Sequence, residues 1–156
     1  MKKIIFGLFV VLFGCSKDKT LTVEEQLQKD IATIDKYVTD NSIANVVKDP
    51  SGLRYTIVAT GTGVKPTLTS KLTVRYTGYL LSTGANFDVR NTAIAFTDPL
   101  SSLIQGWQIG FQLLPEGSKA ILFIPSGLGY GPKGTGNGSI PPNSNLGFTV
   151  ELVKVR

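Results

Sequence analysis

Apolar residues near the start of the chain recur with the period of a helix. They are Val23, Leu27, Ile31, Ile34 and Val38. Because intervals of three and four residues place them on one face, the pattern predicts an amphipathic helix over residues 23–39. Thr22 and Glu25 match a capping box at its start, and the polar residues 40–42 end it. Two interpretations are open for this helix: either it packs against the domain that follows or spaces that domain from the membrane, which we favour, or it forms a dimerisation arm.

From residue 52 onward the apolar residues alternate with a period of two. The clearest stretches are residues 53–57, 72–77 and 148–153, and an uninterrupted apolar run follows at 120–124. Strands with one wet face predict an antiparallel sheet. Residues 100–104 contain neither Gly nor Pro and predict a short helix. Residues 131–142 are rich in both and predict a long surface loop.

A separate apolar run, residues 4–13, follows the charged start Met1-Lys2-Lys3. This order is typical of a secretory signal, and the run is about half as long as a helix needs to cross a bilayer. Cys15 comes directly after Gly14 in a segment that resembles a bacterial lipobox. The resemblance implies cleavage before Cys15, lipidation of its thiol and a membrane anchor. The alternative is a plain signal peptide with an incidental cysteine.

We therefore divide the chain into a signal peptide (1–14), a tether with the amphipathic helix (15–48) and a folded domain (49–156). Ser16 replaces the Asp that often retains lipoproteins at the inner membrane. We expect the protein in the cell envelope, at the outer membrane and on its periplasmic face.

The composition excludes several kinds of chemistry. Histidine is absent and Cys15 is the only cysteine. This removes Ser-His-Asp and Cys-His hydrolases, zinc sites built from His or Cys, and an internal disulfide. We expect neither a metal nor a cofactor. The net charge of +5 is mild and its basic residues are scattered, which argues against nucleic acid as a partner.

A series of motifs follows in order over roughly residues 50–156. They are Val74-Arg75-Tyr76-Thr77-Gly78, Asn86-Phe87-Asp88, Ile104-Gln105-Gly106-Trp107, Pro115-Glu116-Gly117-Ser118-Lys119, Ile124-Pro125, Leu128-Gly129-Tyr130-Gly131, Ile140-Pro141-Pro142 and Phe148-Thr149-Val150-Glu151-Leu152. Taken together they resemble the FKBP-type peptidyl-prolyl cis–trans isomerase family. The resemblance implies an α+β fold: a twisted antiparallel β-sheet of five to six strands wrapped around one short helix, here preceded by the N-terminal helix.

The resemblance also implies an apolar pocket for X-Pro bonds. Its catalytic residues would be Tyr76, Asp88, Ile104 (through its backbone N–H) and Tyr130. Its substrate-binding residues would be Phe87, Ile94, Leu103, Trp107, Ile140 and Phe148, with Trp107 as the floor. Ile94 stands where the family commonly has an aromatic residue. The expected partners are proline-containing polypeptides and macrolides of the FK506 type, bound by a monomer.

The function implied is a peptidyl-prolyl isomerase that assists folding of exported proteins. The main alternative is a chaperone-like lipoprotein that binds peptides in the same pocket without turnover. A third possibility is an assembly lipoprotein in which the 23–39 helix is the active part. A carbohydrate-binding role has little support, because only one Trp is available to stack on a sugar.

Overall fold

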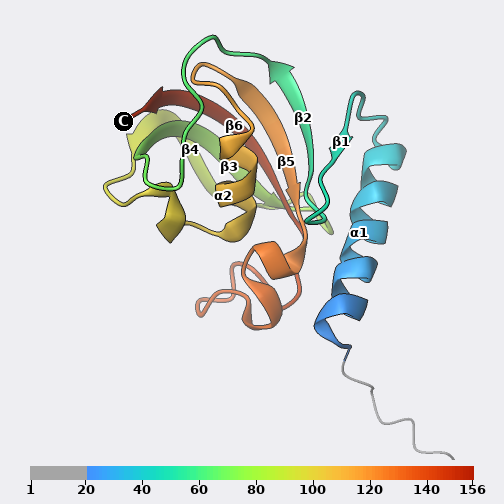
Figure 1. Ribbon diagram of the computed structural model, residues 1–156. Coiled ribbons are helices and arrows are strands. Elements are labelled where there is room, and N and C mark those ends of the chain that lie inside the picture. Colours follow the sequence, from blue (N-terminus) through green and yellow to red (C-terminus); the bar gives the residue numbers. More distant parts are fainter. Residues whose placement is uncertain (1–20) are drawn as a thin grey trace, which may run out of the picture.

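The computed structural model describes residues 21–156; the predicted signal peptide and Cys15 lie outside the described residues. Six strands form one antiparallel sheet in the order β1-β2-β5-β6-β3-β4 (Figure 1). They are β1 (Val47–Lys48), β2 (Arg54–Ala59), β3 (Leu72–Leu80), β4 (Asn86–Ala95), β5 (Lys119–Ile124) and β6 (Leu146–Val155). The helices of this part are α1 (Val23–Asp40) and α2 (Gln105–Gln112), with short 3-10 helices η1 (Leu100–Ser102), η2 (Ser126–Leu128) and η3 (Gly131–Lys133). The predicted α+β fold class is confirmed.

Strand β5 lies between the two helices and is buried on both of its faces (Figure 1). Leu122 and Ile124 belong to the main core around α2, whereas Phe123 packs with Ile34 of α1 on the opposite face. Side chains alternate between the faces of a strand, so a strand covered on both faces has an uninterrupted apolar sequence. This arrangement explains why residues 120–124 lack the alternation seen in β3.

The prediction of a helix over residues 100–104 is wrong in position. Only the 3-10 helix η1 occupies residues 100–102, and the α-helix starts at Gln105. Gly106 and Gly110, which usually weaken a helix, face β5 from α2. A Cβ atom at Gly106 would lie 2.4 Å from Ile124 Cγ2, and one at Gly110 would lie 2.8 Å from Leu122 Cδ1. The glycines therefore let α2 approach the sheet closely, which outweighs their low helix propensity.

Helix α1 begins where its capping box predicts. Thr22 Oγ1 accepts a hydrogen bond from Glu25 N (3.2 Å), and Thr22 N donates one to Glu25 Oε2 (2.8 Å). These two bonds satisfy backbone donors that the first turn of a helix leaves free. Neither α1 nor any other helix within residues 21–156 is long and apolar enough to cross a membrane.

The second half of α1 holds the helix against the sheet. Ile34 is fully buried beside Phe123, and Arg54 of β2 donates a hydrogen bond to Asp35 (Nε–Oδ1 2.8 Å). The predicted packing of the apolar face against the domain is confirmed here. Val23, the first residue of the stripe, is 89 % exposed and takes no part in this contact.

The two edge strands are not predicted by the apolar alternation. Most residues of β4 are exposed, so its sequence lacks the period of a half-buried strand. Strand β1 has only two residues and pairs with β2 through Val47 and Tyr55. The sheet therefore begins shortly before the predicted boundary at residue 49, and the domain division stays a prediction.

Replacing Gly106 by Ala tests the close approach of α2. In an ordinary helix this change is stabilising, but here the new methyl group would clash with Ile124. We expect the free energy of unfolding to fall by about 1–3 kcal/mol in urea titrations, as for overpacked cores. Gly127→Ala is the control, because nothing lies within 4 Å of its Cβ position. Equal stability of the two variants would contradict the packing described.

Candidate active site

A cavity of about 320 Å³ opens between the sheet and the start of α2. All the predicted pocket residues except Ile94 and Ile140 line it. They are Tyr76 of β3, Phe87 and Asp88 of β4, Leu103, Ile104 and Trp107 around the start of α2, Tyr130 between η2 and η3, and Phe148 of β6. Residues from five separate parts of the chain thus converge on one concave, aromatic site.

Trp107 is the buried base of the cavity, with 4 % of its surface exposed. Its ring makes edge contacts with Tyr76 (centroids 5.0 Å apart), Phe148 (5.3 Å), Phe111 (5.0 Å) and Phe96 (5.8 Å). Edge-to-face pairs are the favoured geometry of aromatic rings and add to the energy of their burial. The indole is therefore held in one orientation by a surrounding shell of rings, which makes a rigid apolar surface.

The polar side of the cavity centres on the carboxylate of Asp88. Tyr76 donates its hydroxyl hydrogen to Asp88 Oδ2 (2.5 Å), and Arg90 Nη2 lies 3.3 Å from Asp88 Oδ1. Burial, followed by this hydrogen bond, raises the pKa of Tyr76 to about 12. Burial also raises the pKa of Tyr130, and the charge of Asp88 adds to the effect. Both hydroxyls therefore stay protonated to a higher pH than an ordinary tyrosine.

The backbone at Ile104 supplies a further donor. Ile104 precedes α2 in an extended conformation (ψ 146°), and its carbonyl accepts hydrogen bonds from Trp107 N (2.9 Å) and Gln108 N (3.1 Å). Its own N–H finds no acceptor within residues 21–156. Because buried or half-buried N–H groups are almost always paired, this one is available to a ligand carbonyl in the cavity.

Two predicted residues lie elsewhere, and one aromatic residue of the cavity was not predicted. Ile94 is half-buried in the core rather than on the cavity wall, and Ile140 is buried in the core with 3 % exposed. Their roles in substrate binding stay predictions. Phe96 lines the cavity instead. The exposed edge strand that precedes Phe96 has no clear apolar period, so the sequence carried no signal for it.

The fold and the site define a class of protein that binds an apolar group between aromatic rings and neutral donors. The sequence profile of the FKBP-type peptidyl-prolyl cis-trans isomerase family matches residues 63–153. The chain belongs to this family.

Two relatives and one solved structure support the assignment. Outer membrane protein MIP of Legionella longbeachae is 38 % identical over 134 residues, which cover 85 % of this chain and 57 % of that protein. The isomerase FkpA of Aeromonas hydrophila is 42 % identical over 78 % of this chain and 45 % of its own length. A peptidyl-prolyl isomerase of Pseudomonas syringae superposes with a TM-score of 0.72 at 31 % identity, covering 88 % of this chain and 98 % of its own. The chain spans about half the length of the two curated relatives.

Replacing Asp88 by Asn tests the electrostatics of the cavity. We expect the pKa of Tyr76 to fall from about 12, since the carboxylate charge is lost, but to remain above its usual value because burial is the larger cause. The pKa of Tyr130 should fall as well. Carbon NMR titration of the tyrosine rings measures both, with Asp98→Asn as a control outside the cavity. An unchanged pKa of Tyr76 in the Asp88→Asn variant would show that the hydrogen bond is not formed in solution.

Proposed function

We propose that the protein is an active peptidyl-prolyl cis–trans isomerase that assists the folding of exported proteins. The observation that carries the proposal is the rigid aromatic cavity over Trp107, with the Ile104 N–H free at its edge. Membership of the isomerase family supports the same activity. Its partners are then proline-containing polypeptides, with FK506-type macrolides as competing ligands and a monomer as the working unit.

An apolar cavity lowers the barrier to rotation about an X-Pro bond by favouring the twisted amide. Resonance makes the C–N bond partly double, with a barrier of about 18–20 kcal/mol. The planar amide is more dipolar than the twisted transition state. Transfer from water to an apolar site therefore destabilises the planar amide more than the transition state, and the barrier falls. Only such a difference between the two states accelerates the reaction, and about 1.4 kcal/mol of it corresponds to a tenfold gain in rate.

The polar groups hold the substrate during rotation. The Ile104 N–H is placed to donate a hydrogen bond to a substrate carbonyl, and the Tyr130 hydroxyl has no protein partner within residues 21–156. Asp88 instead engages the Tyr76 hydroxyl, which fixes that ring against Trp107. Asp88 therefore acts as a positioning residue. Neither a nucleophile nor a proton shuttle is needed, which suits a chain without histidine.

Exchange NMR of a short X-Pro peptide tests the activity. The purified protein should accelerate cis–trans exchange, and an FK506-type macrolide should block the acceleration. Trp107→Leu should lower kcat/KM by about tenfold or more and Tyr130→Phe by a smaller factor, because each removes one transition-state interaction. Tyr55→Phe, on β2 outside the cavity, is the matched control. If the macrolide bound but the protein did not accelerate exchange, the isomerase function would be wrong, and the result would favour the alternative, a protein that binds peptides without turnover.

The N-terminal sequence supports localisation of the protein to the cell envelope. The lipobox-like sequence ending at Cys15 would attach the chain to a membrane through acyl chains, and two or more chains make such anchoring stable. A relative from Legionella longbeachae carries the name outer membrane protein. We place the lipidated protein at the outer membrane, on its periplasmic face.

Replacing Cys15 by Ser tests the anchor. The native protein expressed in a Gram-negative host should partition into detergent and show the mass of an acylated N-terminal cysteine. Cys15→Ser should abolish both properties, because serine lacks the thiol that is acylated, while Ser16→Ala should keep them. A membrane-bound Cys15→Ser variant, or an unmodified native mass, would disprove lipidation at this residue.

A further inference from the structure

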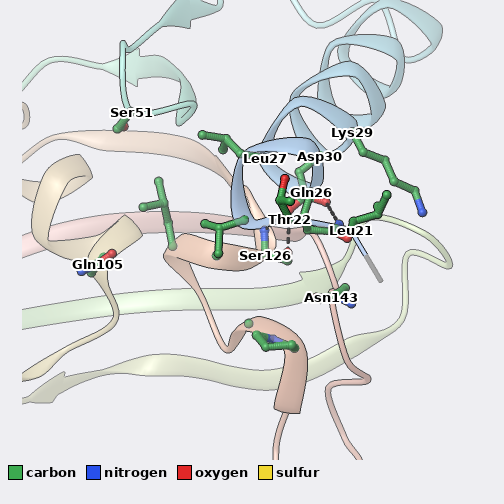
Figure 2. Close-up of a pocket in the computed structure, with 15 residues that line it drawn as sticks. Leu21, Thr22, Gln26, Leu27, Lys29, Asp30, Ser51, Gln105, Ser126 and Asn143 are labelled. Carbon is green, nitrogen blue, oxygen red and sulfur yellow. Dashed lines mark hydrogen bonds between the residues drawn. The ribbon is translucent and has the colours of Figure 1, made fainter. Parts of the chain in front are cut away.

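A second and larger cavity, of about 540 Å³, lies between the start of α1 and the segment that follows β5 (Figure 2). One side is the first turns of α1. The other side is η2 and η3, with Gln105 at one end and Asn143 at the other. We call this cavity the α1 groove. None of its lining residues belongs to the cavity over Trp107.

The walls of the α1 groove are mainly apolar and open to water. Leu21 is 41 % exposed and Val23 is 89 % exposed, although both are aliphatic. Leu27 of α1, Leu128 of η2 and Pro132 of η3 also line the groove. Covering an exposed apolar surface of this kind with another apolar group removes it from water, which lowers the free energy. The groove therefore has the chemistry of a binding site for aliphatic or aromatic side chains.

A buried carboxylate joins the two walls of the groove. Asp30 of α1 is 2 % exposed and accepts hydrogen bonds from Ser126 N (2.9 Å), Ser126 Oγ (2.5 Å) and Gln26 Nε2 (2.7 Å). These bonds tie the first half of α1 to η2, as Figure 2 shows for Asp30 and Ser126. Because Asp30 is fully engaged, it offers no site for a cation. Within residues 21–156, Lys29 is the one other charged residue of the lining, so an uncharged apolar ligand fits best.

The α1 groove adjoins the cavity over Trp107 at two points. Ile104 lines the cavity and Gln105 lines the groove; Tyr130 lines the cavity and Gly131 lines the groove. Consecutive Cα atoms are about 3.8 Å apart. The cavity and the groove are therefore neighbours, separated at each of these two points by a single step along the chain.

From this proximity we infer that the α1 groove binds an apolar segment of the same polypeptide whose X-Pro bond occupies the cavity over Trp107. The inference rests on the proposed isomerase function. Its substrates are then unfolded chains with apolar residues near proline, rather than isolated X-Pro sites. Contact in the groove is remote from the rotating bond and equal in the ground and transition states, so it lowers KM and leaves kcat unchanged.

The test compares two peptides of equal length with the same central X-Pro bond. One carries leucine and valine in four-residue flanks on both sides, and the other carries serine and glycine. With the native protein, the apolar peptide should have a KM about tenfold lower at the same kcat, as expected for burial of one or two aliphatic side chains. The amide signal of Gly127 in the groove should shift on titration with the apolar peptide and stay unchanged with the serine and glycine peptide.

Two matched variants test whether the KM difference between the peptides arises in the α1 groove. Val23→Asp should reduce the KM difference to about threefold or less, because it places a charge on the groove wall. Helix α1 is retained, since an acidic residue in the first turn is favourable. Val64→Asp makes the same change at a valine that is 65 % exposed and lines neither cavity, and it should keep the tenfold difference.

The outcomes separate this inference from the proposed function. Acceleration of both peptides with equal KM would overturn the groove assignment and leave the isomerase function intact. Acceleration of neither peptide would instead overturn the proposed function. If Val23→Asp kept the KM difference but converted a dimer into a monomer in gel filtration, the occupant of the groove would be a second copy of the chain, and the inference would be wrong.

Discussion

The close contact between α2 and β5 is the constraint on which the rest of the structure depends. Gly106 and Gly110 bring the helix against Ile124 and Leu122 at distances that any side chain would prevent. Trp107 lies on the turn between these two glycines, so the same contact sets its depth in the core. Tyr76, Phe148 and the other rings then pack around an indole that is already fixed. The aromatic cavity is thus a consequence of helix packing.

The chemistry of the cavity follows from what surrounds the indole. The carboxylate of Asp88 is engaged by Tyr76 and Arg90, and burial raises the pKa values of Tyr76 and Tyr130, so both phenols are neutral. The site therefore presents apolar surface and neutral donors. Such a site suits a reaction in which no bond is made or broken, and in which an amide rotates faster once it is removed from water. Helix α1 adds a second apolar surface beside it, fastened through Asp30 and Ser126.

Local patterns predicted most of the fold and much of the candidate site. The capping box and apolar stripe located α1, and alternation located β2, β3 and β6, because these signals depend on neighbours in the sequence. Helix α2 was misplaced because Gly106 and Gly110 serve a tertiary contact that sequence periodicity does not record. Phe96 was missed because the exposed edge strand before it has no clear period. The α1 groove was not predictable, since its walls meet only when α1 docks on η2.

The fluorescence of Trp107 tests most directly whether the proline of a substrate binds over this residue, as the proposed function requires. Trp107 is the only tryptophan of the chain, so its emission reports on the cavity alone. We predict a saturable change in emission with an X-Pro peptide, no such change when the cavity is already saturated with an FK506-type macrolide, and no change with the matched X-Ala peptide. Acceleration of X-Pro exchange with no change in Trp107 emission, or the same change with both peptides, would contradict binding at this site.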